Sequence, residues 1–110
     1  MITVSLILNI LVLVPVCTGL FLRARWTDEA YGSATPARGI LLAIYLAILI
    51  GSAALLFRPV PQQVVVLLCL QIVYKLLTPV TVGTFRNPVV LSNIAIAAVH
   101  AVTLGLILGA

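Results

Sequence analysis

The chain has very few charged residues. Of its 110 residues only 7% are charged and 64% are hydrophobic, whereas about a quarter of the residues in a soluble domain are charged. Only two residues are acidic, Asp28 and Glu29, and they are adjacent in a short polar segment. The hydrophobic runs therefore hold no carboxylate for acid–base catalysis, and the sequence shows no catalytic, metal or nucleotide motif. We expect no enzyme activity from this chain alone and no metal site.

Histidine and cysteine are also scarce. His100 is the only histidine, so two histidines from one chain cannot hold a haem, although a single imidazole is able to ligate a haem or chlorophyll metal or to bond a quinone. The sequence favours a structural, hydrogen-bonding role for His100 and requires no cofactor. Cys17 and Cys69 differ in expected membrane depth by roughly 14 Å, which exceeds the roughly 7 Å limit for a disulfide. Both are predicted to be buried thiols.

Long hydrophobic runs make up nearly all of the chain. They cover residues 2–22, 36–57, 61–83 and 88–109, and each has about the 20 residues that a helix needs to cross a bilayer. Between them lie a loop at 23–35, with signals for a short interfacial helix, and two tight turns. The sequence predicts one transmembrane domain, an all-α four-helix bundle with up-down topology.

The basic residues predict the orientation of this bundle. Arg23 and Arg25 lie in the first loop, and Arg38, just beyond its end, is counted with them. Arg86 lies in the third loop, whereas Arg58 is alone in the second. Because basic loops stay in the cytoplasm, both termini are expected on the outer, periplasmic side of a bacterial inner membrane. The first run has no basic leader, so we expect a retained helix rather than a signal peptide. Such scattered arginines do not indicate nucleic-acid binding.

Two helix starts have a strong local signal. Thr35 precedes Pro36, and Asn87 precedes Pro88. In each pair a capping side chain stands before a proline at the first helical position, where the missing N–H does no harm. The sequence therefore predicts that helices begin at these two prolines.

A polar stripe follows the third hydrophobic run. Lys75, Gln71, Tyr74, Thr78 and Thr81 are spaced so that all of them can face one way along a helix. Lipid offers no partners to such groups, so they are expected to face other helices, a cavity or a bound molecule.

Residue depth connects this stripe with the other helices. At about 1.5 Å per residue, Asn9, Gln71 and His100 are each expected roughly 18 to 20 Å from the cytoplasmic helix ends, near mid-membrane. Thr78 and Asn93 share a second level, roughly 8 to 9 Å in. We therefore predict that polar groups meet in two layers.

Three interpretations of this polar core remain open. The groups hydrogen-bond across the bundle and fix helix register, or they line a hydrated or ligand-occupied pocket with Lys75 on its cytoplasmic side, or Lys75 extends toward the headgroups. The second interpretation gives a hypothetical ligand site made of Lys75, Gln71, Tyr74, Thr78, His100, Asn93 and Asn9.

Small residues recur every four positions on two of the predicted helices. Such stripes permit close approach of a neighbouring helix, from this chain, another copy or another protein. We treat them as a candidate partner interface, made of Gly39, Ala43, Ala47 and Gly51 on the second run and Ala97, Ala101, Gly105 and Gly109 on the fourth.

The layout of the chain resembles small bacterial DoxX-like membrane proteins. The resemblance rests on four short spans, the segment 35–39 at the end of the first loop, a basic residue late in the third span at Lys75, and Asn87-Pro88 opening the fourth. It implies an accessory role beside quinone-linked respiratory enzymes and transfers no catalytic residue.

Two functions follow as hypotheses. The first is an accessory or assembly subunit of a larger respiratory or photosynthetic complex in the bacterial inner membrane. Its expected partners are membrane lipids and either other membrane protein subunits or a second copy of this chain. The alternative is a small-molecule or quinone-binding protein, or a small transporter, that uses the polar pocket around Lys75.

Overall fold

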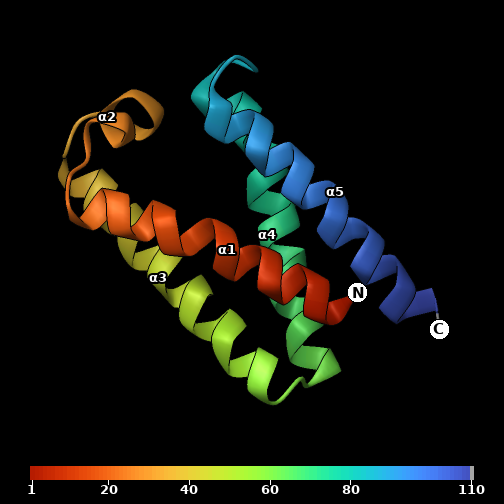
Figure 1. Cartoon of the computed structure of the whole chain (residues 1–110). Coiled ribbons are helices and arrows are strands. Elements are labelled where there is room, and N and C mark those ends of the chain that lie inside the picture. The colour runs from red at the N-terminus through yellow and green to blue at the C-terminus, as the bar shows by residue number, and fades with distance from the viewer. Residues whose placement is uncertain (110) are drawn as a thin grey trace.

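The computed structural model describes residues 1–109, and over that range its secondary structure consists of helices joined by short loops (Figure 1). Its helices are α1 (Ile2–Phe21), α2 (Arg25–Tyr31), α3 (Pro36–Phe57), α4 (Pro61–Val82) and α5 (Pro88–Gly109). The predicted all-α class is confirmed. Four of the helices, all except α2, are long and apolar enough to cross a membrane, so the chain has the build of a multi-pass membrane protein.

The helix ends follow the local signals in the sequence. The Thr35 side chain accepts a hydrogen bond from the backbone N–H of Arg38 at 3.4 Å, and the Asn87 side-chain oxygen accepts one from the N–H of Val89 at 2.8 Å. α3 and α5 begin at the prolines that come next. α4 ends at Val82 and is capped by Gly83, whose φ of 87° places it in the left-handed region that glycine tolerates best.

The long helices pack as two pairs. α1 packs mainly on α3 and α4 mainly on α5, with fewer contacts between the pairs (Figure 1). Apolar clusters hold the pairs: Leu13, Cys17, Leu20 and Tyr45 lie between α1 and α3, and a second cluster, Leu6, Leu55, Val64 and Leu68, joins α1, α3 and α4. The buried polar residues are spread along the same inward faces.

The outer surface is apolar on every long helix. Leu11, Ile50, Leu70 and Leu108, one from each long helix, are each more than 60% exposed. Exposed apolar surface on this scale is unfavourable in water but is what a helix presents to lipid. The outward faces therefore support a membrane setting.

The short helix α2 folds back on the end of α1. The N–H of Ala24 bonds to the carbonyl of Gly19 at 2.9 Å, and the Asn87 side chain donates to the carbonyl of Ala30 at 3.1 Å. Trp26 of α2 covers Gly19, where a β-carbon would overlap the indole ring. α2 is thus held to both helix pairs.

Gly19→Ala is expected to push the Trp26 ring off α1 and to destabilise the protein by about 1 to 3 kcal/mol, a usual cost of overpacking. Trp26 is the only tryptophan, so its fluorescence emission should shift. Gly39→Ala is the matched control, since a β-carbon there meets nothing within 4 Å. Identical emission in the two variants would contradict this packing.

Candidate functional site

One buried polar network surrounds His100. Its Nδ1 lies 3.0 Å from the Ser5 hydroxyl and its Nε2 lies 2.8 Å from Oδ1 of Asn9. The Asn9 amide donates to Ser52 at 3.0 Å, and Ser5 and Thr103 share a 2.7 Å hydrogen bond. The network joins α1, α3 and α5, and all of its members are buried.

The bonding pattern assigns the tautomer of His100. Because Nδ2 of Asn9 donates to Ser52, its Oδ1 is left to accept, and Nε2 of His100 must be the donor. Nδ1 then accepts from Ser5. Both ring nitrogens are occupied by protein partners, so neither is free to ligate a haem or chlorophyll metal. The geometry supports a structural role for His100.

The deeper predicted layer is only partly brought together. Asn9 and His100 meet, but Gln71, which is 1% exposed, makes no hydrogen bond to either, and its Nε2 has no partner within residues 1–109. His100 bonds instead to Ser5, a residue that was not predicted. The sequence spacing could have indicated Ser5, because Ser5 and Asn9 are four residues apart and so share one face of α1.

A second polar cluster surrounds Lys75. Its Nζ donates to Oδ1 of Asn93 at 3.2 Å, and the Asn93 amide donates to the Thr78 hydroxyl at 3.3 Å. The predicted common level of Thr78 and Asn93 is therefore confirmed. Nζ also lies 4.9 Å from the centre of the Tyr74 ring, a cation–π distance.

Lys75 points into the protein rather than toward the headgroups. The residue is only 4% exposed, so the interpretation in which it extends into lipid is wrong. Thr81 departs from the predicted stripe: it is exposed, and its hydroxyl bonds the carbonyl of Thr78 at 3.5 Å. A threonine near a helix end satisfies its hydroxyl on its own backbone, so it needs no inward partner.

Two neighbouring cavities adjoin the Lys75 cluster. One, of about 200 Å³, is lined by Lys75, Asn93 and Trp26 among others. The other, of about 440 Å³, is lined by Thr78 and by the acidic residues Asp28 and Glu29 of α2. Both share Tyr31, Tyr45 and Asn93, so the two spaces meet between α2, α3 and α5.

Tyrosines form one wall of both cavities. The rings of Tyr31 and Tyr45 meet edge to face with centroids 6.0 Å apart. Burial, and then the neighbouring Tyr45, raises the pKa of the Tyr31 hydroxyl above its usual value. Tyr31 therefore stays protonated. The Tyr74 hydroxyl is buried and has no partner in the described part of the chain.

Lys75 has unused hydrogen-bonding capacity. A lysine ammonium carries three N–H donors, and Asn93 is the one side-chain acceptor bonded to Nζ in the range 1–109. Asp28 pairs with Arg38 at 2.5 Å instead. A carbonyl or anionic oxygen in the adjoining cavity would satisfy a remaining donor, so the cluster is suited to such a guest.

The small-residue stripes mostly face outward. Ala97 is buried and Gly51 is half-buried, but the other members of both stripes are exposed, namely Gly39, Ala43, Ala47, Ala101, Gly105 and Gly109. A β-carbon at any of the four glycines would meet no atom within 4 Å. Packing inside this chain therefore uses little of either stripe.

Comparison of the chain with protein-family models, with curated proteins and with solved structures finds no match.

Proposed function

We propose that this membrane protein binds a small molecule carrying a carbonyl or anionic group, such as a quinone ring, in the cavity beside Lys75. The observation that carries the proposal is a lysine only 4% exposed, with a single side-chain acceptor on Nζ among the described residues and a cavity of about 200 Å³ against it. Ionisable groups inside a membrane are costly, and they mark binding sites or transport pathways by default.

The surrounding residues suit a flat, partly polar guest. Lys75 provides donors, Tyr31 and Trp26 provide aromatic surfaces, and apolar side chains such as Val12 and Val16 complete the lining. Ligand sites of this kind combine a mainly apolar wall with a few polar groups that fix orientation. Since no carboxylate pairs with Lys75 in residues 1–109, the site favours oxygen acceptors over cations.

The proposal can be tested with a short-chain ubiquinone analogue. Trp26, the only tryptophan, lines the same cavity as Lys75, and quinones quench indole fluorescence. A titration of the detergent-solubilised protein is expected to give saturable quenching with one site per chain. Quenching that rises linearly, at the rate seen for a free tryptophan analogue in the same detergent, would count against the proposal.

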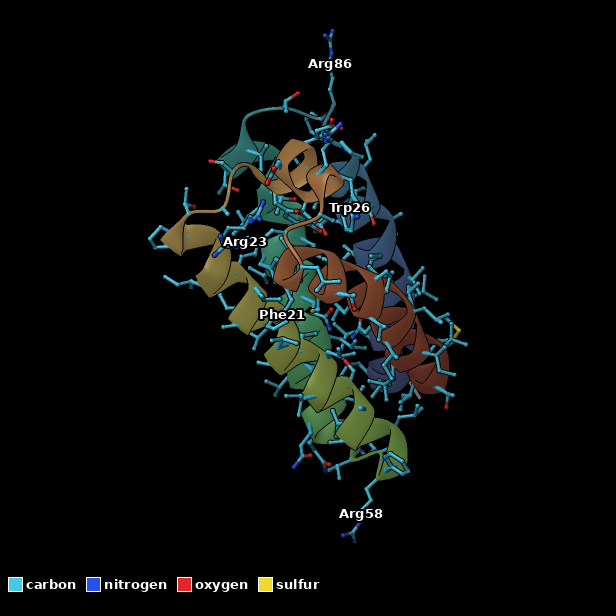
Figure 2. All side chains as sticks on the ribbon, turned by 60° about the vertical axis from the view of Figure 1, so that its left-hand side comes forward. Phe21, Arg23, Trp26, Arg58 and Arg86 are labelled. Carbon is cyan, nitrogen blue, oxygen red and sulfur yellow. The ribbon has the colours of Figure 1, made fainter. Side chains whose placement is uncertain are left out.

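We place the helices in up-down order with both termini outside the cytoplasm of a bacterial inner membrane. The arginine bias of the loops supports this orientation. The Ser5–Thr103 hydrogen bond, which joins the start of α1 to the last part of α5, supports antiparallel neighbours. Figure 2 shows Arg86 and Arg58 at opposite ends of the molecule, as the topology requires. The Lys75 cavities then lie toward the cytoplasm.

Reporter fusions at the C-terminus test the orientation. Alkaline phosphatase fused there is expected to be active, because it folds only outside the cytoplasm, and a green fluorescent protein fused at the same point is expected to stay dark. The opposite pair of results would reverse the orientation and move the Lys75 side of the bundle to the periplasm.

A second candidate function is that of an accessory or assembly subunit in a respiratory or photosynthetic complex. The outward position of most small residues on α3 and α5 favours it, because such faces accept a helix from another subunit or a second copy. The resemblance to DoxX-like proteins supports the same idea. The two functions are compatible, since no residue of the two stripes lines the cavities around Lys75.

Added bulk on these faces is expected to act on partners rather than on the fold. Ala47→Leu and Ala101→Leu change exposed positions, so the bundle should remain folded while a partner is released during purification. Ala54→Leu and Ala98→Leu, exposed alanines outside the stripes, are matched controls that should keep the partner. A wild-type protein that purifies in mild detergent with no partner would contradict the accessory role.

A further inference from the structure

A second site lies along α1 and α3, and residues other than those of the Lys75 cavity line it. We propose that the outer groove between these helices binds one anionic phospholipid, with its phosphate beside Arg23 and Arg38 and an acyl chain along α1 and α3. The site shares no lining residue with the cavities around Lys75, so it is independent of the function proposed above.

The headgroup end is a pocket of about 510 Å³ at the junction of α1 and α3. Its charged lining residues are both arginines, Arg23 and Arg38, and Thr35 adds a hydroxyl. Figure 2 shows Arg23 beside the first turn of α3. Arg23 has a φ of 54°, a left-handed conformation that is uncommon for a residue with a side chain.

Arg38 is buried and fixed in place at the wall of this pocket. It is 6% exposed, and its Nη1 donates to Asp28 at 2.5 Å and to the carbonyl of Gly32 at 2.8 Å. Its Nη2 is buried and has no acceptor within residues 1–109. A buried N–H without an acceptor is costly, and a phosphate oxygen in the pocket would supply one. The ion pair with Asp28 holds the guanidinium in place.

The chain end of the site is an apolar groove of about 310 Å³. It is lined by Val14, Cys17 and Thr18 of α1 and by Leu46 and Leu49 of α3. The Thr18 hydroxyl bonds the carbonyl of Val14 at 2.7 Å, so it presents no unsatisfied group to an acyl chain. Phe21 and Leu42 line both the groove and the arginine pocket, which makes the two spaces continuous.

This combination matches a lipid better than a free anion. An inorganic phosphate would use only the arginine pocket, whereas an anionic phospholipid fills both parts at once. Basic pockets between membrane helices on the cytoplasmic side recognise anionic headgroups, and each arginine there contributes an attraction worth about a fivefold change in affinity. The Asp28 carboxylate neutralises part of the Arg38 charge, so Arg23 supplies the net positive charge of the pocket.

Native mass spectrometry of the full chain, incubated with phosphatidylglycerol or with phosphatidylcholine of the same acyl chains, tests the proposal. One phosphatidylglycerol is expected per chain, with clear preference over phosphatidylcholine. Arg23→Gln should weaken retention about fivefold, while Arg58→Gln and Arg86→Gln, which lie elsewhere on the molecule (Figure 2), should not. Arg23 makes no side-chain hydrogen bond within residues 1–109 that its loss would break, so this variant is expected to fold.

Two further experiments distinguish a bound phospholipid from a bound soluble phosphate. Glycerol 3-phosphate and inorganic phosphate should fail to displace the lipid at equal concentration, and Leu46→Trp, which fills the groove, should weaken lipid retention with circular dichroism unchanged. Equal retention of the two lipids, equal loss in Arg23→Gln and Arg58→Gln, or full displacement by glycerol 3-phosphate would each overturn the proposal.

Discussion

His100→Ala is expected to lower the free energy of unfolding by about 2 to 4 kcal/mol. The substitution removes two buried hydrogen bonds, leaves Ser5 and Asn9 with unpaired groups, and opens a cavity in an enclosed site. Each interhelical hydrogen bond in a membrane is worth about 0.6 to 2 kcal/mol, and the cavity adds to that. Because α1 and α5 share few other contacts, their association should be the first to weaken.

Unfolding in mixed detergent micelles, followed by circular dichroism, gives this free energy. Val102→Ala is the matched control on the same helix, since Val102 is 56% exposed and its truncation should cost little. His100→Gln keeps a donor and an acceptor and should recover part of the loss. If His100→Ala and Val102→Ala were equally stable, the network would not be what holds α1 to α5.

Lys75→Met is expected to reduce the affinity for the ubiquinone analogue at least about tenfold while leaving the fold intact. Methionine keeps most of the side-chain length and volume, so the packing against Tyr74 is largely retained and only the donors are lost. A tenfold change corresponds to about 1.4 kcal/mol, within the range for one hydrogen bond to a charged group. Stability should be unchanged or slightly higher, because an incompletely satisfied buried amino group has been removed.

Thr81→Val is the control for this experiment. Thr81 lies on the same helix but is exposed and bonds only its own backbone, so its loss should not alter quenching of Trp26. Unchanged affinity in Lys75→Met would show that Lys75 only holds α4 to α5 through Asn93. That result would remove the binding proposal and leave the structural interpretation of the cluster.

The elements of the fold were predictable because their signals are local. Thr35-Pro36 and Asn87-Pro88 each combine a cap with a fixed φ angle, and the structure starts α3 and α5 there. Hydrophobic length alone marks the membrane-spanning helices. Depth counting also placed Thr78 and Asn93 together, because the rise of a helix is constant.

The arrangement of side chains around the core was less predictable. Depth put both Asn9 and Gln71 beside His100, but the rotation of each helix about its axis depends on its neighbours. His100 bonds to Asn9 and to Ser5, and not to Gln71. For the same reason, the sequence did not predict that Ala47 and Ala101 face outward. Helix rotation is set by packing across the bundle, which residue spacing within one helix does not report.

Arg38 shows a further limit of counting charges. In the sequence it is one of several loop arginines that set orientation, yet the structure buries it against Asp28 and the carbonyl of Gly32. The contact depends on α2 folding back over the start of α3. No local pattern in the first loop predicts these contacts of Arg38, because Gly32 and Asp28 come six and ten residues before it in the sequence.

Native mass spectrometry of protein purified in mild detergent tests most directly whether the Lys75 cavity holds a small molecule. The wild-type chain is predicted to carry one small molecule with a carbonyl or anionic group, retained in Thr81→Val and Arg23→Gln and lost in Lys75→Met. A wild-type chain that carries lipid alone, with a spectrum identical to that of Lys75→Met, would contradict the claim.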